Sequence, residues 1–300
     1  MELRKLLPFL SFIILLLLVG LVWFFPSTGD FRVDNPFWNG VSGFSDEFDV
    51  VALDSYDKLP VDPAGTALVV VPYEEFSVSE LEEITDYVSL GGTLLVFDDF
   101  GFGNQILDYF GVDARFSGDY LLDPLFNYKN GFFPKITDFG SSSLKGNVSS
   151  VVFNHCSFLS NASNISVIAY SSSFSFVDSN ENGKWDDDEV EGPFPVVGFG
   201  GLDKGVVVFV SDPSMIINGM IGLDDNLVFV GDLVEMKSSS PVVYVDQSHL
   251  PKVALDDAKM VISVVYDFVG LPLVTLSLIV FVFVLGLKPI WQKRKNHEEN

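Results

Sequence analysis

The sequence predicts an α/β domain with a mostly parallel sheet, bounded by two membrane-spanning helices. Long uncharged apolar segments lie near both ends of the chain. Between them, short apolar runs rich in β-branched residues recur, and a helix is clearly marked between two of these runs. No internal repeat or long low-complexity tract divides this central part, so a single domain is the economical interpretation.

The first apolar segment covers residues 6–25 and carries no charge. A helix of about 20 residues, at roughly 1.5 Å per residue, crosses about 30 Å of hydrocarbon, so this segment predicts a membrane span. The alternative is a cleaved signal peptide, whose apolar core has about 7–15 residues and ends at a small-residue cleavage site. Here Phe25 and Pro26 follow the apolar core, which favours a retained helix.

The second apolar segment, residues 269–287, is also uncharged, and Trp291 follows it where an amphipathic ring suits the headgroup layer. It predicts a second span. Basic residues lie on the terminal side of each segment: Arg4, Lys5, Lys288, Lys293, Arg294 and Lys295. Because lysine and arginine favour the cytoplasmic side, we expect residues 1–5 and 288–300 in the cytoplasm and residues 26–268 outside it.

The segment between the two predicted spans is strongly acidic. From Pro26 to Tyr266 it contains 11 lysines and arginines against 37 aspartates and glutamates, a net charge of 11 − 37 = −26. This charge argues against nucleic acids and anionic lipid surfaces as partners, because both are negatively charged. It suits cations or a salty exterior, and other membrane proteins remain candidate partners.

Two further features bear on an exterior location. Cys156 is the only cysteine, so no intramolecular disulfide forms, and a role for it as a nucleophile is not favoured. Three N-x-S sequons begin at Asn147, Asn161 and Asn164. They predict a glycosylated outer surface in a host that has the machinery.

The clearest structural unit is a strand, a helix and a second strand. Residues 67–72 form a continuous apolar run, as expected of a strand covered on both faces. Ser77 and Glu80 have the spacing of a capping box, and the glycines at 91–92 close the helix. One face of this helix is apolar: Leu81, Ile84 and Val88. Residues 93–97 form the next strand, and a right-handed crossover makes the two strands parallel.

Other apolar runs predict the remaining elements. The strand candidates are residues 50–53, 150–153, 165–170, 195–199, 206–210 and 242–245. A helix over residues 226–236 separates the last two strands. Residues 255–268 are helical and partly amphipathic, and lead into the second span without a flexible linker.

Residues 178–189 read DSNENGKWDDDE and match the calcium-loop pattern D-x-[DN]-x-[DN]-G-x5-E at every fixed position. Calcium prefers about six to eight oxygen ligands, and short side chains at alternating positions let one loop surround a single ion. Gly183 permits the sharp turn. The predicted Ca²⁺ ligands are Asp178, Asn180, Asn182, the backbone carbonyl of Lys184, Asp186 directly or through water, and Glu189 with both oxygens.

The flanks of this loop differ from those of a helix–loop–helix hand. Residues 174–177 are strand-like, and residues 192–195, GPFP, do not continue a helix. A loop inserted between strands is therefore expected, with calcium in a structural role, because no helices are present to move in a sensor mechanism. The alternative is an acidic, solvated turn that matches the pattern by coincidence.

Polar residues follow several predicted strands. They are Asp98, Asp99, Asn104, Ser211, Asp212, Asp246 and His249. The carboxyl ends of strands in an open parallel sheet commonly border a ligand crevice, so these residues predict a ligand-binding site. Carboxylates with a histidine can perform acid–base or metal chemistry. The alternative is ordinary capping, since aspartate and asparagine suit the turns that leave strands.

Several short segments resemble a known family. They are residues 39–42 (NGVS), residues 76–104 with their paired glycines and paired aspartates, residues 192–195 (GPFP), and residues 211–214 (SDPS) followed by Asn218. With them, most of the outer domain resembles domain of unknown function 4350, a family of archaeal membrane-anchored proteins whose outer domain is similar to class I glutamine amidotransferases. The resemblance implies a flavodoxin-like parallel sheet.

The resemblance does not extend to glutaminase chemistry. In amidotransferases a cysteine nucleophile stands on a sharp strand-to-helix turn, whereas here the residues after Phe97 read DDFGFGN. Cys156, in NHCSF, lacks the flanking glycines that such a turn needs. Two function classes remain. A non-catalytic outer domain that binds a ligand or assembles with other membrane proteins is favoured over a hydrolase that uses the strand-end carboxylates and His249.

Overall fold

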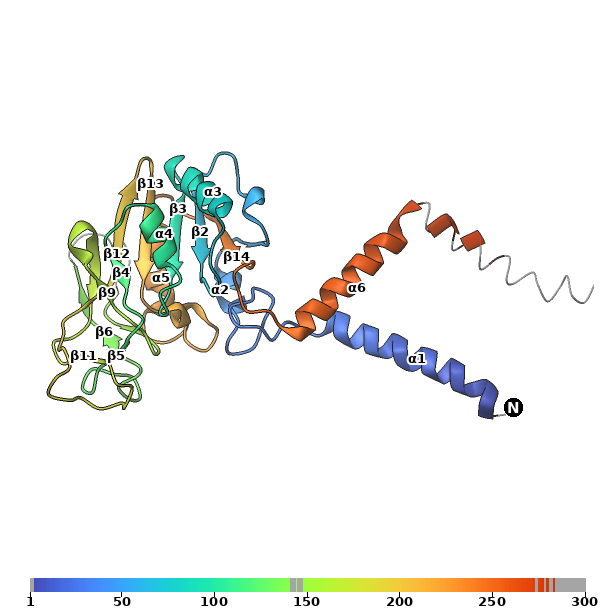
Figure 1. Ribbon diagram of the computed structural model, residues 1–300, viewed down its shortest axis with the longest axis horizontal. Helices are drawn as coiled ribbons and strands as arrows, with labels where there is room; N and C mark the ends of the chain where they lie inside the picture. The colour runs from blue at the N-terminus through green and yellow to red at the C-terminus, as the bar shows by residue number, and fades with distance from the viewer. Residues whose placement is uncertain are drawn as a thin grey trace, which may run out of the picture. The chain divides into compact units, whose positions relative to one another are not determined.

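The computed structural model of the chain describes residues 3–140, 144, 148–272, 275–277, 279, 280 and 283. These residues form two units. The central unit spans Pro26–Pro251, and the other unit holds both ends of the chain, with α1 (Leu3–Phe24) and α6 (Ala254–Gly270) (Figure 1).

The central unit alternates short helices with short strands. Its helices are α2 (Ser42–Glu47), η1 (Tyr56–Lys58), α3 (Val78–Ser89), α4 (Asn104–Tyr109), η2 (Ala162–Asn164), η3 (Pro213–Ile216) and α5 (Asn226–Val234). Its strands are β1 (Val50–Leu53), β2 (Thr66–Val70), β3 (Thr93–Phe97), β4 (Arg115–Phe116), β5 (Tyr120–Leu122), β6 (Lys135–Ile136), β7 (Asp138–Phe139), β8 (Val151–Val152), β9 (Leu159–Ser160), β10 (Ser166–Tyr170), β11 (Phe176–Asp178), β12 (Pro195–Leu202), β13 (Gly205–Val210) and β14 (Val242–Asp246).

The largest sheet of the described residues has eight strands in the order β1-β14-β2-β3-β13-β12-β10-β7. The first five strands are parallel, which confirms the α/β class and the parallel pairing of β2 with β3. The other three are antiparallel, a feature not expected from the sequence. Numbered along the chain, the parallel strands lie in the order 1-5-2-3-4, whereas flavodoxin has the order 2-1-3-4-5.

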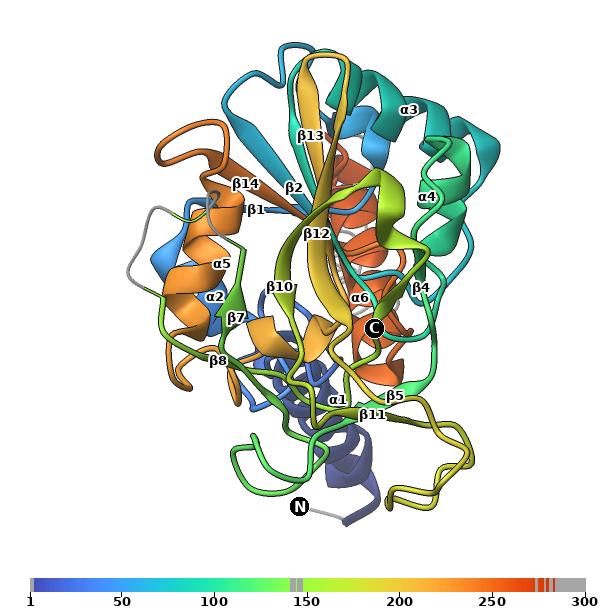
Figure 2. The same cartoon turned by 90° about the vertical axis from the view of Figure 1, so that its left-hand side faces the viewer.

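Helices cover both faces of this sheet, with α3 and α4 on one side and α2 and α5 on the other (Figure 2). Alternate side chains of β3 therefore enter different cores. Leu94 and Val96 pack with the α3 side, and Leu95 and Phe97 with the α5 side. Because both faces are covered at the centre of the sheet, β2 and β3 are continuous apolar runs, as the sequence predicts, whereas the edge strand β1 is partly exposed.

Helix α3 forms where the sequence predicts it, and its capping box is confirmed. The Glu80 N–H donates to Ser77 Oγ at 3.3 Å, and the Ser77 N–H donates to Glu80 Oε2 at 2.8 Å. The end of α3 lies very close to the start of β13. A Cβ on Gly205 would lie 2.0 Å from the Val88 carbonyl oxygen, so only glycine fits this crossing.

The segment that enters the central unit is tied to the segment that leaves it. The Arg32 guanidinium donates to the carbonyl oxygens of Gln247 at 2.7 Å and Pro251 at 3.3 Å. The Val33 N–H donates to the Gln247 side-chain oxygen at 3.2 Å. The connections to α1 and α6 therefore leave the central unit from one place.

The flanking helices carry the first predicted span and the start of the second. Helix α1 has 22 residues, and most of its apolar side chains from Leu10 onward are exposed. The Trp23 ring contacts that of Tyr266 in α6, with centroids 6.2 Å apart. Among the described residues, no helix combines the length and apolar character required to cross a membrane. Residues 273, 274, 278, 281, 282 and 284–287 of the second predicted span, and all of the tail 288–300, lie outside the described residues.

Replacing Phe209 by alanine should destabilise the central unit strongly. This ring is fully buried in β13 on the α3 side of the sheet. A cavity there should lower the free energy of unfolding by about 3–5 kcal/mol. Val51→Ala on edge strand β1, where the side chain is 40% exposed, is the control and should cost only about 0.5 kcal/mol. Denaturant unfolding of the full chain in detergent measures both, and equal losses would contradict the layer arrangement.

Candidate functional site

The carboxyl ends of β14, β2, β3 and β13 meet at one edge of the sheet, because these neighbouring strands are parallel. The sequence-predicted polar residues lie along this edge. Asp98 and Asp99 follow β3, Asp212 follows β13, and Asp246 is the last residue of β14. Their contacts decide whether they form one site.

The Asp98 carboxylate organises the turn that leaves β3. It is buried and accepts hydrogen bonds from the backbone N–H groups of Phe100 at 2.8 Å, Gly101 at 3.0 Å and Gly103 at 2.6 Å. Burial raises the pKa of Asp98, and these hydrogen bonds oppose the rise because they stabilise the charged form. Asp98 therefore acts as a turn cap that leads into α4.

Asn104, at the start of α4, is also used structurally. Its amide nitrogen donates to the Phe116 carbonyl oxygen at 3.0 Å, and its amide oxygen accepts from the Phe116 N–H at 2.9 Å. The side chain thereby extends the backbone pattern of β4. Both polar atoms are occupied by this pairing.

Asp212 caps the turn after β13 in the same way. Its carboxylate is fully buried and accepts from the N–H groups of Asn154 and Ser214, both at 2.8 Å. Burial raises the pKa of Asp212 well above its usual range, and the nearby Asp99 carboxylate raises it further. Asp212 thus joins the segment after β8 to the end of β13.

Asp99 differs from its neighbours because one carboxylate oxygen, Oδ1, is buried without a hydrogen-bond partner. Burial raises the pKa of Asp99 to about 7, and the charge of Asp98 adds to this effect. Asp98, Asp99 and Asp212 therefore form one cluster at the ends of β3 and β13. The charge of Asp98 raises the pKa of Asp99, and the charge of Asp99 raises the pKa of Asp212.

Cys156 lies near this group but is not positioned for nucleophilic chemistry. It is fully buried, and its Sγ lies 3.9 Å from the Leu121 carbonyl oxygen. Burial raises the pKa of the thiol well above its usual range, and the charges of Asp212 and Asp99 act in the same direction. Because the thiolate is the nucleophile, Cys156 is a structural side chain.

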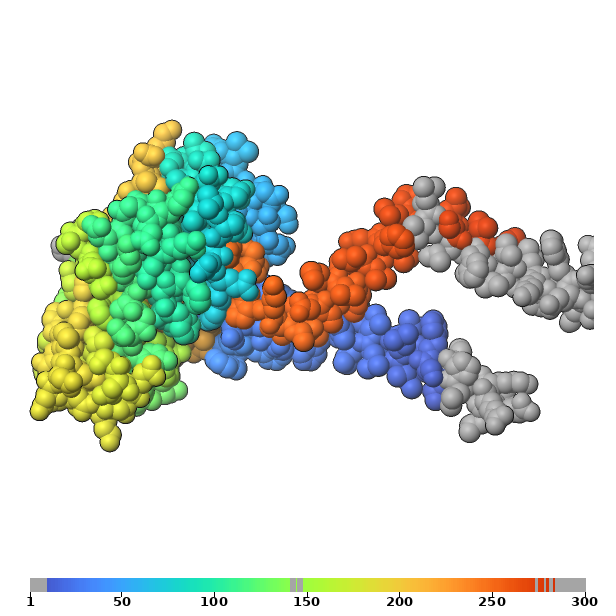
Figure 3. Space-filling view, viewed as in Figure 1, coloured from blue at the N-terminus to red at the C-terminus, as the bar shows by residue number. Residues whose placement is uncertain are grey.

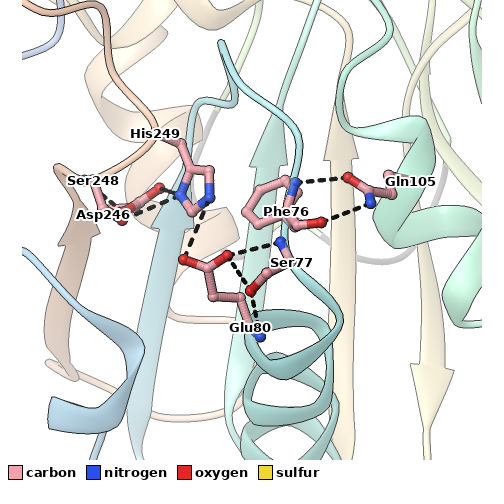
Figure 4. Close-up of polar contacts among 7 residues, drawn as sticks. All are labelled: Phe76, Ser77, Glu80, Gln105, Asp246, Ser248 and His249. Atoms are coloured by element: carbon pink, nitrogen blue, oxygen red, sulfur yellow. Dashed lines mark hydrogen bonds and ion pairs between the residues drawn. The ribbon is translucent and has the colours of Figure 1, made fainter.

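His249 and Asp246 form a separate cluster at the end of β14, with Glu80 from α3 (Figure 4). His249 Nδ1 is 2.9 Å from Asp246 Oδ2, and His249 Nε2 is 3.7 Å from Glu80 Oε1. The histidine is only 4% exposed. Burial opposes the charged ring, but the hydrogen bond and charge of Asp246, together with Glu80, outweigh it and raise the pKa of His249.

Aromatic rings hold the imidazole in place. The Phe76 ring stacks on His249 with centroids 4.1 Å apart, and Tyr56 lies at 5.7 Å. Gln105 fixes Phe76 by accepting from its N–H at 2.7 Å and donating to its carbonyl oxygen at 2.8 Å. Sequence reasoning missed this role of Phe76, Tyr56 and Glu80, and the capping-box spacing of Glu80 was the only signal for any of them.

The structure does not bring all the predicted strand-end residues together. In the described part of the chain, no hydrogen bond or ion pair joins His249 to Asp98 or Asp212. Strand β2 lies between β14 and β3, so it separates the two clusters along the edge. His249, Asp98 and Asp212 therefore do not form one connected cluster among the described residues.

Three of the predicted calcium ligands, Asn180, Asn182 and Asp186, contact one another within loop 178–189, which lies on the surface between β11 and β12 (yellow in Figure 3). Asp178 is 1% exposed and accepts from the N–H groups of Asn182 at 3.0 Å and Gly183 at 2.8 Å. The amides of Asn180 and Asn182 both lie against Asp186 Oδ2, at 2.8 and 2.6 Å. The hydrogen bond from Asn180, and after it the one from Asn182, lowers the pKa of Asp186.

The other loop positions complete this arrangement. The Glu189 carboxylate accepts from the N–H groups of Ser179 and Asp186, both at 3.1 Å. Gly183 has φ +72°, a left-handed conformation that glycine adopts without strain, at the position where a sharp turn was predicted. Within the described residues, no group of three or more His, Cys, Asp or Glu side chains is already arranged to hold a metal. The loop's donors also include asparagines and a backbone carbonyl, which suit a hard cation.

Comparison with solved structures gives distant similarities. The mmIFT52 N-terminal domain has a TM-score of 0.42 at 14% identity, over 54% of this chain and 73% of that one. A β-galactosidase from Bacillus circulans sp. alkalophilus has a TM-score of 0.36 at 14% identity, over 59% of this chain and 23% of that one. A cytoplasmic protein from Salmonella typhimurium LT2 has a TM-score of 0.35 at 13% identity, over 63% and 78%. No match was found among curated proteins.

The central unit is an α/β domain on a mostly parallel sheet, with two polar clusters at the carboxyl edge and an acidic loop inserted between β11 and β12. The model of one protein family matches residues 34–234, more than half of the 300 residues. The chain belongs to the family called domain of unknown function DUF4350.

The ion pair of His249 predicts a specific pH dependence of stability. The folded pKa of His249 lies above the unfolded value of about 6.5, so its contribution is complete below pH 6.5 and is lost as the pH rises through the folded pKa. His249→Gln should cost about 1–3 kcal/mol at acidic pH, because Asp246 loses its partner, and less at alkaline pH. Chemical denaturation across pH 5–9 measures this difference.

His155→Gln is the matched control for this experiment. Burial lowers the pKa of His155, so the pH dependence of its contribution is opposite to that of His249. The contribution of His155 to stability is lost as the pH falls. A cost of His249→Gln that stayed constant over the pH range would show that the pKa of His249 is the same in the folded and the unfolded protein.

Proposed function

We propose that this protein is a membrane-anchored, extracytoplasmic ligand-binding or assembly domain without catalytic activity, stabilised by a calcium ion in loop 178–189. The observation that carries the proposal is the contact among three predicted ligand side chains, those of Asn180, Asn182 and Asp186, within that loop. Asn180 and Asn182 contact the same oxygen of Asp186, and Asp178 and Glu189 hold the two ends of the loop.

The arrangement suits calcium after a small change. A half-turn of each asparagine amide would bring its oxygen beside Asp186 Oδ2, in exchange for the hydrogen bonds that the Asn182 and Lys184 N–H groups now donate to these oxygens. The Lys184 carbonyl and the Asp178 and Glu189 carboxylates add oxygen ligands of the type that calcium prefers. The ion would neutralise part of the acidic loop and hold β11 to the following segment, which is a structural role.

The non-catalytic part of the proposal is supported by how the strand-end residues are used. The Asp98 and Asp212 carboxylates accept backbone N–H groups, and both atoms of the Asn104 amide are paired. These are capping contacts. The alternative, a hydrolase, is favoured by the 2.9 Å contact between Asp246 and His249 alone, because that pair has the geometry of an oriented base.

The membrane part of the proposal is supported by α1 and by the flanking charges. Exposed apolar side chains such as Leu17 and Leu21 need a nonpolar environment, which a bilayer supplies. The basic residues at both ends of the chain favour cytoplasmic termini. Other membrane proteins are then the natural partners of the helices. An archaeal source, an amidotransferase-like ancestry and glycosylation at Asn161 belong to the same proposal.

Calcium should raise the melting temperature of the full chain in detergent. With a dissociation constant of about 10⁻⁴ to 10⁻³ M, 10 mM calcium should add about 1.5–3 kcal/mol, or roughly 3–10 °C. Asp178→Ala should abolish the calcium-dependent shift, whereas Asp188→Ala, at a non-ligand position of the same loop, should retain it. A melting temperature that chelation leaves unchanged, with no heat of calcium binding by calorimetry, would remove the calcium site.

Cysteine labelling tests the proposed orientation. Val61 is 94% exposed, so Val61→Cys should react with a membrane-impermeant maleimide on intact cells. The wild-type chain supplies the background control, because its only cysteine is buried. Asn296→Cys, in the tail, should react only after the cells are opened. The reverse pattern of labelling would place the central unit in the cytoplasm.

A further inference from the structure

A cavity of about 460 Å³ lies beside loop 178–189. One wall is formed by β5 and the residues that follow it, and another by β11 and the loop. Its volume is within the range of about 300–1,000 Å³ that small-molecule sites occupy. None of the strand-end residues discussed above lines it, so it is distinct from both polar clusters.

The charge of this cavity is opposite to that of the domain around it. Its two charged lining residues are Lys129 and Lys184, and no aspartate or glutamate lines it. Neither ammonium has a carboxylate within 4.0 Å in the described part of the chain, although Lys184 is near enough to Asp186 to lower its pKa. Lys129 lies over the Tyr128 ring, 5.2 Å from its centroid. Two lysines without ion pairs favour an anionic ligand.

The remaining lining groups supply a flat apolar surface and hydrogen-bonding atoms. Trp185 is 47% exposed, and the buried Phe176 lies deeper. Asn127 donates its amide nitrogen to the Asp123 carbonyl oxygen, and Asn130 accepts the Phe132 N–H with its amide oxygen. The Asn127 oxygen and the Asn130 nitrogen have no further partner among the described residues, so they remain available for hydroxyl groups.

We propose that this cavity binds a carboxylated sugar. Lys129 and Lys184 bind the carboxylate, Trp185 stacks on the apolar face of the ring, and the free amide atoms of Asn127 and Asn130 bind hydroxyl groups. The inference rests on the proposed function, since Gly183, Lys184 and Trp185 belong to the loop that calcium holds. Calcium should therefore strengthen sugar binding by fixing this wall of the cavity.

Calorimetric titration of the full chain in detergent with D-glucuronate tests the proposal. Saturable binding is expected, at least tenfold tighter than that of D-glucose, which lacks the carboxylate, or of acetate, which lacks the ring. Lys184→Gln, Lys129→Gln and Trp185→Ala should each weaken glucuronate binding about tenfold, a loss of about 1.4 kcal/mol. Lys58→Gln, an exposed lysine outside the cavity, should leave it unchanged. The melting temperature of each variant, measured in the same preparation, shows whether it is folded.

The outcomes separate this inference from the calcium proposal. Absence of glucuronate binding to a chain whose melting temperature responds to calcium overturns the sugar site only. Glucuronate binding without any calcium response overturns the calcium site and retains the cavity. Equal binding of acetate, or an equal loss with Lys58→Gln, shows non-specific attraction of anions and overturns the proposal.

Discussion

Burial of strand β3 on both faces is the constraint on which the central unit depends. Its side chains alternate between the two cores, and its neighbours β2 and β13 occupy both edges. The strand therefore ends in a fixed position, and the chain must turn while still buried. Asp98 makes this turn possible, because a buried carboxylate is tolerated only when hydrogen bonds replace its solvation, and three backbone N–H groups do so.

The same requirement explains why most polar groups at the carboxyl edge serve the fold. Asp212 joins the segment after β8 to the end of β13. Asp246 and His249 are hydrogen-bonded to each other, and the Phe76 ring stacks on the imidazole. A carboxylate used in this way is poorly placed to exchange its partners with a ligand. The cavity between β5 and β11 differs, because Asn127 and Asn130, which line it, each keep one amide atom without a partner among the described residues.

Periodicity and turn chemistry predicted the parallel half of the sheet because each strand there is a continuous apolar run between turn signals. Strands β4 to β9 contain only two or three residues each and are set by distant partners, so among them only β8 lies within a predicted strand, residues 150–153. The site follows the same division. The contacts of Asn180 and Asn182 with Asp186 arise within one short loop, whereas Glu80 meets His249 only after β14 has paired with β2.

The contacts of Arg32 and Gln247 close the central unit at its base, where the chain enters and leaves. These hydrogen bonds hold the two ends of the central unit together, close to the points where the chain continues into α1 and α6. A force on either helix would act first on the three hydrogen bonds between residues 32–33 and 247–251, and only afterwards on the hydrogen bonds between the strands of the sheet. Movement of either terminal segment is therefore resisted at this closure before it can displace β3, the strand that is buried on both faces.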